Sequence, residues 1–310
     1  MKAILQSTAF LVLMALGTAV TAQDAMTVPE YFEYRNVDFD SIEIKAETIA
    51  PGLYVLSGRG GKVVASIGEQ GVLIVDDQYP ALAPKIIAAI RDLGGDDVDF
   101  VINTHWHFDH TMANPTFSEA GAWIVSHANS RRMMTDSQVV NLVTYAVEQP
   151  KSPPEGLPVI TYDDRMQIYF NDEQIDLLHF GAAHTTGDTA VIFRRHNAVH
   201  MGDVFFSRSY PFIDVDNGGS LDGVIRFCEA VLNEITDDTV VIPGHGRLAT
   251  YADLKGYTEM LRTIRDRIAA LIADGATLDE VIAAKPTAEW DAEWRNPIRL
   301  IDRAYAGLTR

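Results

Sequence analysis

The sequence predicts an α/β protein, because segments with the pattern of strands alternate with segments with the pattern of helices from about residue 40 onward. The alternation is clearest where an apolar strand at residues 72–75, a helix at 83–93 and a strand at 98–103 follow one another. The chain has 310 residues, of which 47% are hydrophobic, and it can therefore bury a large core.

The first half is predicted to hold, in order, strands at 52–57, 62–67 and 72–75, a helix at 83–93, strands at 98–103 and 122–126, and a helix at 129–148. Glycines within residues 58–61 supply the turn between the first two strands, so these strands are expected to pair as a hairpin. Gly94 and Gly95 end the first helix, because glycine is the usual residue just past a helix.

The second half is predicted to hold strands at 174–180, 189–193, 198–201 and 239–242 and helices at 221–235, 252–273 and 278–284. Thr277 and Glu280 form a capping box at the start of the last of these helices. Residues 150–158, rich in proline, are the one linker-like stretch, but they separate polar residues that are expected to meet in one site. We therefore predict a single domain over residues 23–310.

Residues 1–22 have the pattern of a secretory signal peptide, with a basic start, a mostly apolar run and small residues at the end. The apolar run is shorter than the ~20 residues that a membrane-spanning helix needs, and a membrane-anchoring amphipathic helix is the alternative. We expect cleavage, a mature chain with no membrane span, and a periplasmic or secreted location in a bacterium.

The charge and the cysteine count exclude several kinds of protein. The formal net charge is -18, with 43 acidic and 25 basic residues, which disfavours a nucleic-acid partner and leaves a small-molecule substrate. Cys228 is the single cysteine, so neither an intrachain disulfide nor a zinc cluster of several thiolates can form. Its apolar surroundings predict a buried core residue.

The first motif that carries chemistry follows the strand at 98–103 and contains His105, His107, Asp109 and His110. Alternate side chains of an extended backbone lie on one side, so His110 is expected to point away from the other three. Imidazole and carboxylate ligands suit zinc or a similar divalent metal, and the two directions suggest two metal subsites.

Three later fragments each place one ligand-capable side chain directly after a predicted strand. They contain His184, Asp203 and His245, in the sequences A-A-H-T-T-G-D, H-M-G-D and P-G-H-G. The carboxyl ends of strands are where α/β folds place their sites, so these side chains are expected to join the first motif.

Together, the H-x-H-x-D-H motif and the later H-T-x-G-D, G-D and G-H-G fragments resemble the metallo-β-lactamase superfamily, from about residue 52 to residue 249. The resemblance implies a four-layer αβ/βα sandwich with a dinuclear metal site between two sheets. It implies two Zn²⁺ per chain, with iron or manganese as alternatives. It also implies that His105, His107 and His184 hold one metal, that Asp109, His110 and His245 hold the other, and that Asp203 bridges them.

The function implied by the resemblance is that of an exported metal-dependent hydrolase of the β-lactamase or lactonase kind. A water shared by two divalent ions has a pKa lowered toward ~7, and the resulting bridging hydroxide would attack a carbonyl while Asp109 orients or deprotonates it. The expected substrate is a cyclic amide such as a β-lactam, a lactone, an ester or a thioester. The alternatives are a mononuclear iron oxidoreductase resembling persulfide dioxygenases and a thioesterase resembling glyoxalase II.

Further residues are expected around the metals. Asp76, after the strand at 72–75, and Asp188, four residues after His184, would accept the other N–H group of a ligating imidazole. Asp188 fits a turn or cap equally well. Weaker candidates for substrate binding are Arg59, Phe206, Arg208 and Tyr210, and the last three belong to an aromatic loop that could equally anchor itself to the core.

Overall fold

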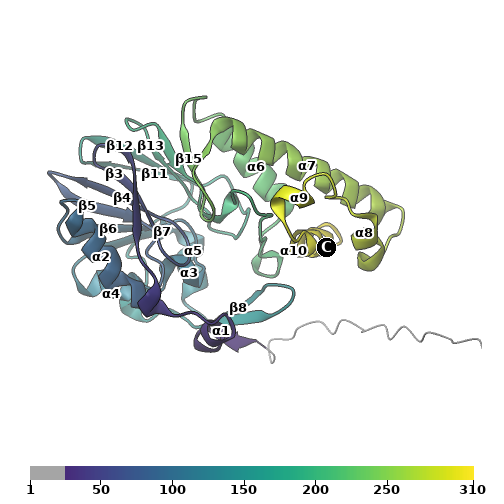
Figure 1. Cartoon of the computed structure of the whole chain (residues 1–310), viewed down its shortest axis with the longest axis horizontal. Coiled ribbons are helices and arrows are strands. Elements are labelled where there is room, and N and C mark those ends of the chain that lie inside the picture. The colour runs from purple at the N-terminus through teal and green to yellow at the C-terminus, as the bar shows by residue number, and fades with distance from the viewer. Residues whose placement is uncertain (1–24) are drawn as a thin grey trace, which may run out of the picture.

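Two mixed β-sheets face each other in the computed structural model, which describes residues 25–310 (Figure 1). The predicted signal peptide at 1–22 lies outside the described residues. The first sheet has seven strands in the order β10-β7-β6-β5-β4-β3-β2. Their bounds are Lys45–Ala50 (β2), Leu53–Ser57 (β3), Val63–Gly68 (β4), Gly71–Val75 (β5), Val98–Asn103 (β6), Trp123–His127 (β7) and Ile160–Tyr162 (β10).

The second sheet has six strands in the order β11-β12-β13-β14-β15-β16. Their bounds are Arg165–Phe170 (β11), Glu173–Leu178 (β12), Ala190–Phe193 (β13), Ala198–His200 (β14), Val240–Ile242 (β15) and Ala249–Thr250 (β16). Strand β5 pairs in parallel with β6, and β14 with β15, so in each sheet the loops after these paired strands leave at one edge.

The sheets pack through alternate side chains of their strands. Val64 and Val75 of the first sheet join Leu177 of the second in one buried cluster, whereas Val63 and Val72 belong to the cluster on the other face of the first sheet. This period of two is the pattern of a strand that is buried on both faces.

Helices cover the outer faces of both sheets (Figure 1). The helices α2 (Ala83–Asp92) and α4 (Asn114–Glu119) share a buried cluster with the first sheet. The helices α6 (Leu221–Leu232), α7 (Tyr251–Ala273), α8 (Leu278–Ala284) and α10 (Ile298–Leu308) share another with the second. The remaining helices are α1 (Val28–Tyr34), α3 (Phe108–Thr111), α5 (Ala128–Met134) and α9 (Asp291–Trp294). The predicted αβ/βα sandwich is thus confirmed.

A third sheet, in the order β1-β9-β8, corrects one prediction. Its strands are Met26–Thr27 (β1), Gln138–Asn141 (β8) and Ala146–Gln149 (β9). The helix predicted at 129–148 is wrong beyond Met134, because the chain there turns back on itself as a hairpin. β-Branched residues such as Val139, Val140 and Val147 favour strands, and Val143 in the turn has a φ of 72°, which no helix accommodates.

The other predicted helices and strands are confirmed within a few residues, although the helix predicted at 221–235 ends at Leu232. The capping box of Thr277 and Glu280 is present, and Cys228 is buried. Strands β2, β10 and β11 and helices α1 and α10 were not predicted. No helix within residues 25–310 has the length and apolar character needed to cross a membrane.

Candidate metal centre

The histidine-rich motif leaves the first sheet at the end of β6. His105 and His107 follow the strand in the loop, and α3 begins directly after His107 and carries Asp109 and His110. The three histidines are buried, and the Asp109 side chain is 19% exposed. The Gly61 N–H group of the β3–β4 turn donates to the Asp109 carbonyl at 3.0 Å, which fixes the motif against the first sheet.

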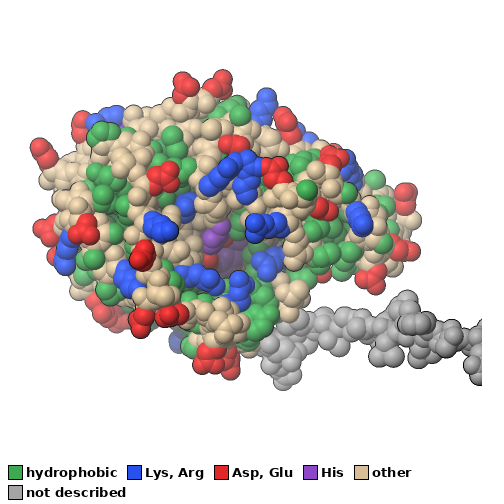
Figure 2. Space-filling model, in the orientation of Figure 1, with side chains coloured by type: hydrophobic (Ala, Val, Ile, Leu, Met, Phe, Trp, Pro, Cys, Tyr) green, Lys and Arg blue, Asp and Glu red, His purple; other side chains and the backbone are tan. Residues whose placement is uncertain are grey.

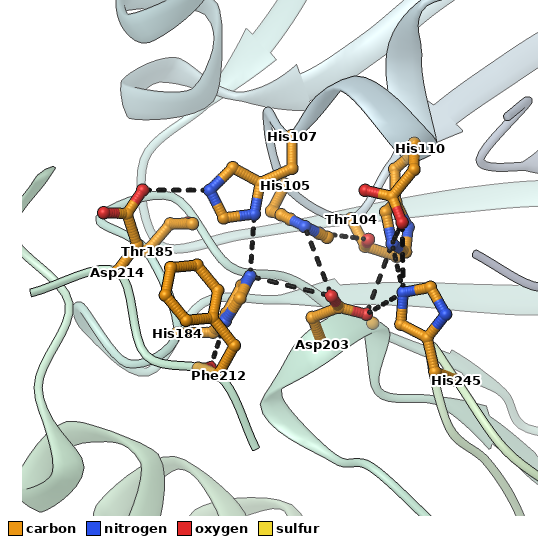
Figure 3. Close-up of polar contacts among 12 residues, drawn as sticks. Thr104, His105, His107, His110, His184, Thr185, Asp203, Phe212, Asp214 and His245 are labelled. Carbon is orange, nitrogen blue, oxygen red and sulfur yellow. Dashed lines mark hydrogen bonds and ion pairs between the residues drawn. The ribbon is translucent and has the colours of Figure 1, made fainter. Parts of the chain in front are cut away.

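The second sheet supplies the other three candidates. His184 lies in the loop after β12, Asp203 in a 3₁₀ turn after β14, and His245 in the loop after β15. The structure brings all seven predicted ligands together. The five histidines and Asp203 point toward one another (Figure 3).

Three groups of donor atoms in this cluster could each hold a metal ion, and the atoms of each group lie within 4.8 Å of one another. The groups are His105, His107 and His184; His105, His110 and Asp203; and Asp109, His110 and His245. In the first group, His184 Nε2 lies 2.9 Å from His107 Nδ1. In the third, His245 Nε2 lies 3.2 Å from Asp109 Oδ2.

Asp203 lies between the two outer groups (Figure 3). Its Oδ2 is 3.7 Å from His184 Nε2 and 4.0 Å from His105 Nε2. Its Oδ1 is 3.2 Å from His110 Nε2 and 3.3 Å from His245 Nε2. One carboxylate therefore offers one oxygen to each group, which is the geometry that a bridging ligand requires.

The outward nitrogens of four of the five imidazoles are held by the protein, which leaves their inward nitrogens free to bind a metal. Asp76 Oδ2 accepts from His110 Nδ1 at 2.7 Å and from Thr104 Oγ1 at 2.8 Å. Because the single hydroxyl proton of Thr104 goes to Asp76, its oxygen must accept from His105 Nδ1, 3.0 Å away. Asp76 thus orients two of the histidines, in the position expected of it.

The hydrogen-bond acceptors that hold the outward nitrogens of His107 and His184 were not predicted. His107 Nε2 donates to Asp214 Oδ2 at 2.9 Å, and His184 Nδ1 donates to the carbonyl oxygen of Phe212 at 2.8 Å. Both acceptors belong to the loop that follows Asp203, and no spacing in the sequence relates them to the histidines.

The prediction for Asp188 requires a correction. Its carboxylate accepts from the backbone N–H groups of Ala183 and Thr185 and from the Thr185 hydroxyl, and no imidazole is among these partners. Asp188 shapes the loop that presents His184, so the turn interpretation is the one that the structure supports.

The donor set fits a divalent metal. Among residues 25–310, His105 Nε2 and Asp203 Oδ1 are buried without a hydrogen-bond partner, although such atoms are costly to bury alone. Both face the centre of the cluster (Figure 3). Neutral imidazoles and carboxylates at this spacing are the ligands that zinc and similar ions prefer.

The pKa shifts of the histidines differ between the group of His105, His107 and His184 and the group of Asp109, His110 and His245. Burial, together with the nearby His110 and His184, lowers the pKa of His105 well below its usual value. Burial also opposes protonation of His110 and His245, but the carboxylates around them prevail. Asp203, Asp109 and Asp76 raise the pKa of His110, and Asp203 and Asp109 raise the pKa of His245 to about 9.

Metal binding to the group of Asp109, His110 and His245 is expected to release about two protons from its imidazoles near neutral pH, in addition to any proton lost by a metal-bound water, because a ligating imidazole must be neutral. The surrounding carboxylates raise the pKa of His110 and His245, which favours their cationic form in the metal-free protein, whereas burial lowers the pKa of His105 and His184. The release is expected to decline as the pH rises through about 9, where His245 deprotonates without metal. Titration of the metal-free protein with zinc, in a weak buffer that contains a pH indicator, measures the number of protons released. Undiminished release at about pH 10 would contradict this assignment.

A cavity of about 200 Å³ opens onto the cluster. Five of the predicted site residues line it: His107, Asp109, Asp203, Phe206 and His245. The Phe206 ring stacks on the His245 ring with centroids 5.3 Å apart. Arg59 is half-buried in the β3–β4 turn and is not among the lining residues.

Arg208 and Tyr210 do not reach this cavity, so their prediction as substrate contacts is corrected. Arg208 forms an ion pair with Glu293 and lines a separate cavity beside α7 and α9. The Tyr210 hydroxyl donates to Asp291 Oδ1 at 2.9 Å. Both side chains anchor their loop to the C-terminal helices.

Comparison with curated proteins and solved structures shows which fold and family the chain resembles. The chain is 26% identical over 192 residues to a probable metallo-hydrolase of Methanocaldococcus jannaschii, covering 59% of this chain and 85% of that one. It is 23% identical over 186 residues to the 2,4-dinitroanisole O-demethylase subunit alpha of a Nocardioides species, covering 58% of this chain and 50% of that one.

Two solved structures share the fold. The DIM-1 metallo-beta-lactamase superposes with a TM-score of 0.58 at 16% identity, covering 72% of this chain and 99% of that one. The metallo-beta-lactamase from Pontibacter korlensis gives a TM-score of 0.58 at 13% identity, covering 71% and 99%. Residues 63–255 match the family described as the Metallo-beta-lactamase superfamily. The chain therefore belongs to the metallo-beta-lactamase superfamily.

Proposed function

We propose that this metal-dependent hydrolase is a dinuclear zinc enzyme that cleaves a carbonyl substrate, namely a cyclic amide, a lactone, an ester or a thioester. The observation that carries the proposal is the position of Asp203, whose two oxygens face two separate groups of histidines. A site for a single ion does not need a carboxylate whose two oxygens face two separate groups of histidines.

The residues that would hold the ions follow from the geometry. His105, His107 and His184 would hold one ion, and Asp109, His110 and His245 would hold the other, with Asp203 between them. Two divalent ions, when bound, make hydroxide available at neutral pH and polarise a carbonyl oxygen.

Asp109 is the residue of the chain best placed to move a proton. Its carboxylate lines the cavity, and its Oδ2 lies 3.2 Å from His245 Nε2. Although burial opposes ionisation, the neighbouring His110 and His245 lower the pKa of Asp109 below its usual value. It is therefore ionised at neutral pH, able to orient an attacking water and accept its proton.

A hydrolysis screen of the purified chain tests the proposal. Protein prepared without added metal and then loaded with zinc is assayed against β-lactams, acyl-homoserine lactones, simple esters and thioesters. We expect two zinc ions per chain by plasma mass spectrometry and turnover of at least one substrate class, which a chelator removes and zinc restores.

The metal-free protein is the control for turnover that does not depend on zinc. A chain that binds two zinc ions and cleaves none of these substrates would overturn the proposal. Recovery of one iron per chain and no zinc from cells would instead support the oxidoreductase alternative.

A further inference from the structure

We propose that the cavity over the metal cluster selects a negatively charged acyl substrate, and that Arg35 and Arg299 bind its anionic group. The inference rests on the proposed hydrolase function and adds the substrate class to it. Both arginines line the cavity of about 200 Å³ that also exposes Asp109, Asp203 and His245. Figure 2 shows Lys and Arg side chains around the opening in which histidine is visible.

The two arginines come from opposite ends of the described chain. Arg35 caps the C-terminus of α1, and Arg299 lies in the first turn of α10. The family match spans residues 63–255, so both lie outside it. The scaffold that holds the metal ligands is thus shared with the family, whereas these two cations are brought to the cavity by segments that flank that scaffold.

Within residues 25–310, neither arginine forms an ion pair, although the chain carries 43 acidic residues. Arg35 Nη1 donates to the Tyr145 hydroxyl at 2.9 Å, and Arg299 lies over the Phe212 ring at 5.9 Å from its centroid. By contrast, Arg303, one turn further along α10, pairs with Asp216 at 2.7 Å. The arginines at the cavity are held by neutral groups and keep their charge available to a ligand.

The position of Arg299 does not serve the stability of its helix. A cation in the first turn faces the positive end of the helix dipole, which is unfavourable. Helix α10 has no acidic residue in its first turn to offset this charge. An anion bound in the cavity would neutralise both the guanidinium and the helix terminus.

The walls between the arginines and the metal cluster are aromatic. Tyr31 packs edge-on against Phe108 with centroids 5.6 Å apart and stacks on Tyr145 at 5.9 Å. Phe206 and Phe212 line the cavity beside the histidines. The cavity therefore fits a substrate with an apolar body, a scissile carbonyl at one end and a carboxylate or similar anionic group at the other, such as the half-ester of a dicarboxylic acid.

A matched pair of substrates tests the assignment. The mono-4-nitrophenyl ester of adipic acid and 4-nitrophenyl hexanoate share a six-carbon acyl chain and differ in the terminal carboxylate. We expect the zinc-loaded protein to favour the half-ester in kcat/KM. Arg35→Gln and Arg299→Gln are each expected to lower that preference about tenfold through KM, the scale of one hydrogen bond to a charged group. Arg226→Gln, an exposed arginine on α6, is the control that keeps the preference.

A binding measurement separates the arginines from the metals. Adipate is titrated calorimetrically into the metal-free protein, and the affinity is expected to fall about tenfold in Arg35→Gln and Arg299→Gln and to stay unchanged in Arg226→Gln. If neither ester is cleaved, the screen of all four substrate classes decides the hydrolase proposal, and the adipate titration separately decides whether the arginines bind an anion. Hydrolysis of both esters with a ratio that survives in both cavity variants would overturn this inference and leave the hydrolase proposal standing.

Discussion

Asp203→Ala is expected to abolish hydrolysis while the protein keeps its fold and loses one of the two metal ions proposed for it. One oxygen of Asp203 faces His110 and His245, and the other faces His105 and His184, so no other side chain replaces it. We expect kcat to fall by about 10²–10³ or more, the scale of losing one preorganised electrostatic contact at a reacting centre. Zinc content, circular dichroism and steady-state kinetics measure the three effects.

The matched control for this variant is Asp172→Ala, because the Asp172 side chain is 96% exposed and lies in the turn between β11 and β12. It is expected to keep two zinc ions and full activity. Two zinc ions per chain in Asp203→Ala would show that this carboxylate is not the bridge.

Gly244→Ala is expected to disturb the same metal site, because Gly244 packs directly against Asp203. A Cβ atom at Gly244 would collide with Asp203 Oδ1 and lie 2.7 Å from the carbonyl carbon of Gly202, closer than real side chains approach. The Asp203 carboxylate must then move away from His110 and His245. We expect a fall in zinc content toward one ion per chain, a loss of activity of about 10²-fold and a destabilisation of about 1–3 kcal/mol from overpacking.

Gly256→Ala is the control for Gly244→Ala. Gly256 lies inside α7, where an added Cβ atom meets no atom within 4 Å. Alanine favours a helix over glycine by about 1 kcal/mol, so this variant is expected to be slightly more stable and fully active. Urea unfolding and zinc analysis of both variants give the comparison. Wild-type zinc content in Gly244→Ala would mean that the site tolerates a displaced Asp203.

The metal ligands could be predicted because their placement is local. His105 to His110 form one contiguous motif after a strand, and His184, Asp203 and His245 each lie close behind a strand or at its end. The carboxyl ends of neighbouring strands bring such residues to one edge of each sheet, and the resemblance to the superfamily related the residues of the two sheets to one another.

The substrate cavity could not be predicted in the same way. Asp214 is 107 residues from the histidine that it orients, and Arg35 is 110 residues from Tyr145. These contacts depend on how the β8–β9 hairpin and α10 fold over the cleft, and the hairpin had been predicted as a helix. The aromatic residues after Asp203 divide between two places: Phe206 and Phe212 line the cavity, while Tyr210 anchors the loop elsewhere. The composition of this loop alone does not distinguish the aromatic residues that line the cavity from the one that anchors the loop.

The candidate metal ligands are divided between the two sheets, and this division affects the stability of the fold. Each of the three possible metal groups combines side chains of the first sheet with one of the second: His184, Asp203 or His245. A bound ion is therefore a cross-link between the two halves of the sandwich. In a chain with a single cysteine, which can form no internal disulfide, bound metal ions would provide a cross-link between these halves that a disulfide cannot. Metal binding to the folded chain would raise the free energy of unfolding by an amount that grows with the free metal concentration relative to the dissociation constant.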